Sequence, residues 1–268
     1  MKATAADKKP NIRAMFFDID GTLVSFKSHT VPPSTVAAIR QAQAKGIKAF
    51  IATGRAVFQI PDLGGLQFDG YIAQNGVYCI TDKNEVLLKS PVPKEDVEAL
   101  LAYLDKEPCS CSFMTTDRIV INFVGPEVKT VTKLVNVSAP PVGDLREAAK
   151  EDIYQINIYM DRERERLLMR DVLVHCELSR WHPMFADLNT KGFSKQTGID
   201  KFLEHYRFRL DETMAFGDGG NDISMLRHVA IGVAMGNATA DVKAQADYIT
   251  DSVDDDGVGK ALRHFGVI

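Results

Sequence analysis

Short apolar runs alternate with helical segments at the start of the chain. Residues 12–17 and 47–52 are mainly apolar and read as buried strands, and residues 32–45 between them read as a helix that ends at Gly46. The second run stops at Thr53, Gly54 and Arg55. Continuous apolar strands that alternate with helices are typical of a parallel sheet covered on both faces.

The same alternation returns near the end of the chain. Residues 213–217 read as a strand, a helix is expected through His228, residues 231–233 are apolar, and a further helix is expected around Asp241 before residues 248–249. Together the two parts predict an α/β fold, a Rossmann-like parallel sheet with helices on both faces.

The middle of the chain has a different pattern. Strands are predicted at residues 86–88, 119–123 and 153–159, and helices at 97–106 and 162–174, with prolines and Gly192 near the ends of the segment. We expect residues 85–187 to be an inserted α+β domain, and residues 1–84 and 188–268 to form the core.

Composition narrows the possible partners. The 268 residues carry a formal charge of −4 with 45% hydrophobic residues, which gives no overall basic footprint for nucleic acid. No apolar run approaches the ~20 residues that span a membrane, and the first residues lack the apolar centre of a secretory signal, so no membrane contact and a cytoplasmic location are expected. Cys109 and Cys111 are too close for a structural zinc knuckle, so we expect the four cysteines to be reduced thiols.

Acidic residues follow two of the predicted strands. Asp18 and Asp20 come just after the first strand, and Asp218 and Asp222 flank two glycines after a later one. Such carboxylates suit a hard divalent metal, or a division between a nucleophile and an acid/base, although each pair alone could be a solvated turn. Thr53 could cradle phosphate oxygens at the end of a third strand, and a lysine such as Lys195 or Lys191 could supply positive charge.

The four segments together resemble a known family. Residues 17–22 (FDIDGT), residues 53–55 (TGR), Lys195 and residues 217–222 (GDGGND), in this order, resemble the four motifs of haloacid dehalogenase-like (HAD) phosphatases. The long insertion between the second and third motifs, and the segment QNG at residues 74–76, are similar to the Cof-type subfamily of sugar phosphatases. Gln196 stands where the family usually has glycine.

The resemblance implies a role for each matching residue. Asp18 would be the nucleophile and a Mg²⁺ ligand, and Asp20 the general acid/base, which also gives its backbone carbonyl to the metal. The remaining implied roles are phosphate binding by Thr53, Gly54, Lys195 and Asn221, and metal binding by Asp218, with Asp222 supporting the metal directly or from behind its ligands.

The inserted domain would act as a cap that supplies the pocket for the leaving group. Its candidate substrate contacts, with one from the core, are Asn75, Arg118, Tyr154, Trp181 and Asp187, whereas Phe185 fits a buried core position better. The expected partner is a small-molecule phosphate ester, handled by a monomer or weak homo-oligomer. Hexose phosphates are the first expectation, and pyridoxal phosphate or a flavin nucleotide is the second.

Three alternatives compete with the phosphatase interpretation. A dehalogenase would share Asp18 but needs neither a metal nor a second aspartate at the position of Asp20. A phosphosugar mutase would hand the phosphoryl group to a second sugar hydroxyl instead of water, and the motifs leave it open. A non-enzymatic binding module predicts loss of the acidic set, which is intact here.

Overall fold

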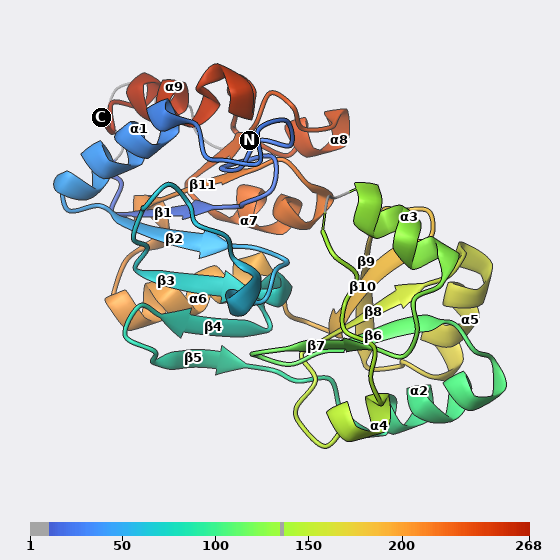
Figure 1. Ribbon diagram of the computed structural model, residues 1–268. Helices are drawn as coiled ribbons and strands as arrows, with labels where there is room; N and C mark the ends of the chain where they lie inside the picture. Colours follow the sequence, from blue (N-terminus) through green and yellow to red (C-terminus); the bar gives the residue numbers. More distant parts are fainter. Residues whose placement is uncertain (1–10, 135–136) are drawn as a thin grey trace.

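The computed structural model describes residues 11–134 and 137–268, apart from the side chain of Trp181. Within these residues the strands form two sheets, one of eight strands and one of five, and helices pack against both (Figure 1). We call them the core sheet and the cap sheet. The α/β class predicted from the sequence is confirmed.

The core sheet has the strand order β13-β12-β11-β1-β2-β3-β4-β5. Neighbours from β13 to β3 run parallel, and β4 and β5 are added antiparallel at the edge. The strands are β1 (Ala14–Phe17), β2 (Lys48–Ala52), β3 (Gly70–Ala73), β4 (Tyr78–Thr81), β5 (Val86–Lys89), β11 (Thr213–Gly217), β12 (Ile231–Ala234) and β13 (Tyr248–Ile249).

Alternate side chains of β1 enter different apolar layers. Met15 and Phe17 face a cluster that includes Ile39 and Leu262, from helices α1 (Pro33–Ala44) and α9 (Gly257–His264). Phe16 points to the opposite face and joins a cluster with residues of α6 (Lys195–Tyr206) and α7 (Ile223–His228). Because both faces are covered, every residue of β1 is buried and the strand reads as a continuous apolar run.

Shorter elements complete the core. They are the helix α8 (Ala240–Lys243) and the 3₁₀ helices η1 (Val57–Gln59), η2 (Gln74–Gly76), η3 (Leu210–Glu212), η4 (Gly220–Asp222) and η5 (Val253–Asp255). The turns η2 and η4 lie at the ends of β3 and β11, where they border the candidate site described below.

The cap sheet is antiparallel, with the order β7-β6-β8-β10-β9. Its strands are β6 (Ser110–Met114), β7 (Ile119–Ile121), β8 (Gln155–Tyr159), β9 (Cys176–His182) and β10 (Phe185–Thr190), and the helices that accompany it are α2 (Lys94–Lys106), α3 (Pro126–Leu134), α4 (Leu145–Ala148) and α5 (Arg162–Asp171). One face packs apolar side chains such as Phe113 and Ile156 against Leu100 of α2 and Leu168 of α5.

The other face of the cap sheet is mixed. Ser112, Gln155, Asn157 and Asn189 are buried there although they are polar. An apolar cluster that includes Tyr159 and Phe185 lies under α3 at one end of the same face. Buried polar groups need hydrogen-bond partners, so this face carries an internal polar network.

The chain passes between the two sheets slightly later than the sequence pattern indicated. The strand predicted at residues 86–88 exists as β5, but it pairs with β4 in the core sheet instead of joining the insert. At the other end, β10 extends to Thr190, three residues beyond the expected end of the insert. Thr190 Oγ1 donates to the carbonyl of Pro91 at 3.0 Å, which ties the two connecting segments together.

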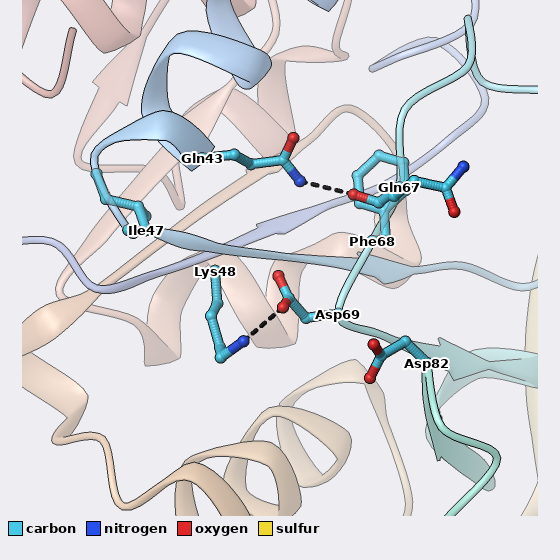
Figure 2. A pocket seen from close by; sticks show the side chains of 8 residues that line it. Gln43, Ile47, Lys48, Gln67, Phe68, Asp69 and Asp82 are labelled. Carbon is cyan, nitrogen blue, oxygen red and sulfur yellow. Dashed lines mark hydrogen bonds and ion pairs between the residues drawn. The ribbon is translucent and has the colours of Figure 1, made fainter.

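A hollow of about 390 Å³ lies at the amino ends of β2 and β3 (Figure 2). The Lys48 ammonium contacts Asp69 there at 2.5 Å, and Gln43 donates to the carbonyl of Gln67 at 2.6 Å. Ligands of parallel α/β sheets bind at the carboxyl ends of the strands. This hollow is therefore separate from the candidate site, which lies at the opposite edge.

In the described part of the chain, none of the helices combines the length and the apolar character needed to cross a membrane. All four cysteines are buried and unbridged. Burial raises the pKa of Cys79 and Cys176 to about 12 and that of Cys109 to about 11, so these thiols stay protonated and unreactive at neutral pH.

Candidate active site

Three neighbouring strands bring the sequence motifs to one edge of the core sheet. Asp18 follows β1, Thr53 follows β2 and Asp218 follows β11, and β1 lies between the other two strands. Phe17 is in register with both Phe216 and Ile51, so the three strands end level with one another. The carboxyl ends of parallel strands meet at one edge, which explains why residues far apart in sequence converge.

Three carboxylates and one ammonium group form the centre of the site. An oxygen from each of Asp18, Asp218 and Asp222 lies within 4.8 Å of the others. Lys195, the first residue of α6, contacts Asp18 Oδ1 at 2.6 Å and Asp222 Oδ1 at 2.5 Å through its Nζ. The Lys195 side chain is fully buried, so its charge acts on these carboxylates without screening by water.

Negative charge is in excess at this centre, because three carboxylates face one ammonium group. Burial raises the pKa of Asp18 well above its ordinary value; Lys195 lowers it, and the neighbouring carboxylates raise it again. Burial first, and then the charge of Asp222, raise the pKa of Asp218 to about 7. Burial alone would lower the pKa of Lys195, but the charges of Asp18 and Asp222 outweigh it and raise that pKa.

Asp222 is occupied by donors from the protein itself. Its Oδ1 accepts from Lys195, and its Oδ2 accepts from the backbone N–H groups of Asp218 at 2.9 Å and Gly219 at 2.8 Å. These bonds fix the turn that follows β11 and aim Lys195 at Asp18. Both oxygens of Asp222 thus accept from the protein, and its predicted role, as a metal ligand or as a support behind the ligands, stays a prediction.

The donor set fits Mg²⁺. It consists of hard carboxylate oxygens, which this ion prefers, and a divalent cation would neutralise the charge of three carboxylates that face a single ammonium group. Asp18 and Asp218 are the side chains predicted to hold it. The backbone carbonyl of Asp20 remains a predicted further ligand, since the carboxylate of Asp20 is not part of the cluster.

Asp218 is oriented by Thr22, which belongs to the first matched motif, and by Asn237, which the sequence did not indicate. Thr22 Oγ1 donates to Asp218 Oδ1 at 3.0 Å, and Asn237 Nδ2 donates to Asp218 Oδ2 at 3.2 Å. Gly21 lets this carboxylate approach, because a Cβ at that position would lie 2.2 Å from Asp218 Oδ2 and the backbone has φ +84°. Asn237 follows β12, so the rule that polar residues gather after apolar strands could have indicated it.

Asp20 turns toward Arg55, and the sequence reading gave Arg55 no role. Arg55 Nε contacts Asp20 Oδ2 at 2.8 Å and its Nη2 contacts Asp20 Oδ1 at 2.7 Å, a two-pronged ion pair. Arg55 also donates to the carbonyl of Gln59 at 3.1 Å. The fork geometry fixes the orientation of the Asp20 carboxylate at the rim of the site.

The other residues predicted to bind phosphate lie in the turns that follow β2 and β11. Thr53 is buried, and its Oγ1 accepts from the backbone N–H of Arg55 at 3.1 Å, so the hydroxyl hydrogen can point elsewhere. A Cβ at Gly54 would lie 3.2 Å from Asn75 Oδ1, which places Gly54 beside that residue. Asn221 Nδ2 in turn donates to Asn75 Oδ1 at 3.0 Å.

The predicted cap contacts have varied surroundings. Arg118 is paired with Glu151 at the cap surface, and Tyr154 packs edge-on against Tyr78 of the core with ring centroids 5.5 Å apart. Asp187 accepts from Gln155 and from Asn157 on the polar face of the cap sheet.

Two further cap residues were singled out from the sequence. Trp181 lies in β9, and its side chain is outside the described part of the structure. Phe185 is buried in the apolar cluster under α3, as its predicted core position requires.

The pair between Asp20 and Arg55 gives a first testable expectation. Arg55→Ala should lower kcat/KM for a sugar phosphate about ten- to a hundredfold, the range of one charge-assisted hydrogen bond of ~1.5–3 kcal/mol. It should affect an aryl phosphate much less, because that leaving group departs without a proton. Arg209→Ala is the matched control, since Arg209 forms the same two-pronged pair with Asp211 away from the site. Equal losses with both substrates would contradict a role through Asp20.

Known proteins similar to this chain belong to the family that the four motifs resemble. The model of the haloacid dehalogenase-like hydrolase family matches residues 15–262. YkrA of Bacillus subtilis (strain 168), a provisionally named phosphatase, is 33% identical over 258 residues, which cover 96% of this chain and 98% of YkrA.

Two solved structures are similar over nearly the whole chain. BT4131, described as a sugar phosphatase of HAD subclass IIB, is 46% identical with a TM-score of 0.87, and the match covers 96% of this chain and 100% of BT4131. BT1666 from Bacteroides thetaiotaomicron, described among phosphatases of the haloalkanoate superfamily, is 37% identical with a TM-score of 0.91, and the match covers all of both chains.

Proposed function

The chain belongs to the haloacid dehalogenase-like hydrolase family and is a phosphatase, and we propose that it hydrolyses small sugar phosphates with Mg²⁺ as its cofactor. The observation that carries the mechanism is the buried contact of 2.6 Å between Lys195 Nζ and Asp18 Oδ1. It holds a carboxylate at the end of β1 in a fixed orientation, beside the groups that can stabilise a transferring phosphoryl group.

In the first step, a carboxylate oxygen of Asp18 attacks phosphorus and the bond from phosphorus to the ester oxygen breaks. Asp20, in its acid form, gives its proton to the departing oxygen, which leaves as an alcohol. The product on the protein is an aspartyl-phosphate at Asp18. In the second step, Asp20 takes a proton from water as the water attacks phosphorus, and the bond to Asp18 breaks to release phosphate.

The surrounding residues would act on the charge of the phosphoryl group. Its three oxygens share negative charge during transfer, and Lys195, the Thr53 hydroxyl and the Asn221 amide can donate to them. Mg²⁺ held by Asp18 and Asp218 would supply positive charge that stabilises the transferring phosphoryl group. A dehalogenase reading is disfavoured, because it leaves Asp20 with its fixed partner Arg55 unexplained.

Removal of divalent metal gives a second testable expectation. Exhaustive chelation should lower activity by at least about a hundredfold, because one oxyanion-stabilising group alone is worth that much, and added Mg²⁺ should restore it. Asp218→Asn should raise the Mg²⁺ concentration needed for half-maximal activity, because an amide is a weaker ligand than a carboxylate. Asp62→Asn is a surface control, since Asp62 caps a loop through Gly65 N–H. Full activity after chelation would contradict the metal requirement.

Sugar phosphates are the preferred substrates for two reasons. Asp187 is half-buried on the polar face of the cap sheet, and its carboxylate has acceptor sites for sugar hydroxyl groups besides those that bond Gln155 and Asn157. In addition, BT4131 is described as a sugar phosphatase. Pyridoxal phosphate and flavin mononucleotide are the second candidates. Because their leaving groups are planar rings, they would need a pocket lined by aromatic side chains.

A substrate panel with Mg²⁺ tests this proposal. Hexose phosphates, pyridoxal phosphate, flavin mononucleotide and an aryl phosphate would be compared by kcat/KM and by release of free phosphate. We expect the hexose phosphates to exceed both cofactor phosphates by at least about tenfold, with stoichiometric phosphate release. Preference for a cofactor phosphate would overturn the substrate class, and an isomeric sugar phosphate formed without free phosphate would indicate a mutase.

A further inference from the structure

Four hydrogen bonds between side chains connect the phosphate-binding turn of the core to the cap. Asn221 Nδ2 donates to Asn75 Oδ1 at 3.0 Å, and Asn75 Nδ2 donates to Asn189 Oδ1 at 3.3 Å. Asn189 Nδ2 then donates to Gln155 Oε1 at 3.4 Å, and Gln155 Nε2 donates to Asp187 Oδ1 at 3.1 Å. We call these five residues the amide chain. It runs from η4 through η2 to strands β10 and β8 of the cap sheet.

In every bond of the amide chain the donor lies on the Asn221 side and the acceptor on the Asp187 side. Acceptor groups without a hydrogen, a carboxylate and a backbone carbonyl, fix this direction. An ionised carboxylate has no hydrogen to give, so Gln155 must present its NH₂ group to Asp187 and its oxygen to Asn189. Asn189 is fixed a second time, because its Nδ2 also donates to the backbone carbonyl of Tyr154 at 3.0 Å. A head-to-tail series of amides is polarised along its length, so each bond strengthens the next.

The direction of the amide chain decides which end of Asn221 faces the site. With its Nδ2 held by Asn75, its oxygen lies beside Gly219, where an added Cβ would be 2.7 Å from Asn221 Oδ1. An amide nitrogen carries two hydrogens, and the second can donate to a phosphoryl oxygen. If the amide of Asn221 were flipped, Oδ1 would occupy the present position of Nδ2. The oxygen would then repel a phosphoryl group instead of donating to it.

The backbone of η2 is held from both sides. Gln74, Asn75 and Gly76 have φ values of +50°, +59° and +101°, a left-handed run that is costly for residues other than glycine. On the core side, Asn75 N–H donates to the carbonyl of Thr53 at 3.0 Å. On the cap side, Gln74 Nε2 donates to the carbonyl of Thr115 at 3.2 Å. The turn therefore stands between the phosphate-binding segment and the cap.

We propose that Asn189 of the cap and Asn75 of the core are positioning residues, which fix the amide of Asn221 so that it donates to the phosphoryl group. Because Asn189 belongs to the cap, phosphate binding in the core then depends on the position of the cap, even for a ligand too small to touch it. The proposal rests on the proposed function, in which Asn221 contacts phosphate.

A double-mutant cycle with inorganic phosphate as the probe tests this coupling. The measured quantity is the inhibition constant of phosphate against a small aryl phosphate, in Asn189→Ala, Asn221→Ala and the double variant, with Mg²⁺ present. We expect Asn221→Ala to raise the constant about tenfold, as for one hydrogen bond to a charged group, and Asn189→Ala to raise it about three- to tenfold. The double variant should be no worse than Asn221→Ala alone.

Two further variants separate this role from a structural one. Asn75→Gly keeps the left-handed backbone while it removes the amide. It should raise the inhibition constant of phosphate about three- to tenfold, the range expected for Asn189→Ala, and it provides the test if Asn189→Ala folds poorly. Ser110→Ala is the matched control, because Ser110 is buried on the same cap face and its Oγ accepts from the Gly125 N–H at 3.1 Å, away from the amide chain. Its constant should stay within about twofold of the wild type.

The outcomes that overturn the proposal are distinct. If Asn221→Ala raises the inhibition constant but Asn189→Ala and Asn75→Gly do not, the coupling is wrong and the phosphate contact stands. If the effects of Asn189→Ala and Asn221→Ala multiply in the double variant, Asn189 acts independently of Asn221 and the coupling is again wrong. If Asn221→Ala has no effect, the phosphate contact of the proposed function fails, and the coupling fails with it.

Discussion

Asp18→Asn is expected to lower kcat by at least about ten-thousandfold, because an amide is a poor nucleophile and a weak ligand for Mg²⁺. The protein should nevertheless fold. Asparagine keeps the shape of Asp18, and Lys195 keeps its buried ion pair with Asp222 at 2.5 Å. The melting temperature of the variant should stay close to that of the wild type.

Steady-state kinetics and thermal unfolding of the same preparation check both halves of this expectation. A variant that loses activity and also melts earlier would show only that Asp18 supports the fold. Rates close to the wild type would require a mechanism in which water attacks phosphorus directly, without an aspartyl-phosphate.

Asp20→Ala is expected to separate two classes of substrate. A sugar alkoxide needs a proton as it leaves, so kcat/KM for a sugar phosphate should fall about a hundred- to ten-thousandfold, the range of general acid catalysis. An aryl phosphate leaves without that proton. The variant should therefore phosphorylate Asp18 with it and then stall, since no base remains to activate water, and should release a burst of phenol close to one equivalent per site.

Asp20→Asn is the matched control for this experiment, because it keeps an oxygen for Arg55 while it removes the acid/base. Both variants should show the burst if the proton transfer is what was lost. Equal slowing of both substrates without a burst would show that Asp20 acts on the geometry of the site and not as the proton carrier.

The layout of the core could be predicted from the sequence because parallel buried strands leave a clear trace. Strands β1, β2 and β11 are apolar, and each is followed at once by a polar residue of the site: Asp18, Thr53 and Asp218 respectively. The pattern of apolar residues indicates which strands are buried, but it does not indicate which strands pair with one another. For this reason the pattern predicts a strand at residues 86–88 but not its pairing with β4 of the core sheet, outside the insert.

Strands of the cap were harder to predict because their polar face is buried. In β6, Ser110 and Ser112 alternate with apolar residues, and a strand with this pattern looks like a loop when serine is taken as a mark of exposure. Burial of these side chains depends on partners supplied by other strands, such as Asn157 for Ser112. Local sequence does not contain that information.

The same limit applies to the contacts that orient the site. The sequence indicates Asp20 as a site residue, and Arg55 belongs to one of the matched motifs. Their ion pair could not be predicted, because it joins residues 35 positions apart. Asn75 and Asp187 stay predicted substrate contacts, but their hydrogen bonds within the amide chain could not be predicted from the sequence. Such contacts follow from tertiary packing, and they determine which way a side chain points.

The central claim is that the phosphoryl group passes through Asp18, and trapping it there is the most direct test. Asp20→Ala would be mixed with an aryl phosphate and Mg²⁺, quenched in acid during the phenol burst, and digested for mass spectrometry. We expect close to one phosphoryl group per protein, on the peptide that contains Asp18, stable to acid and released by hydroxylamine as an acyl phosphate is. A burst with no phosphoryl group on the protein, or with the group on another residue, would contradict the account.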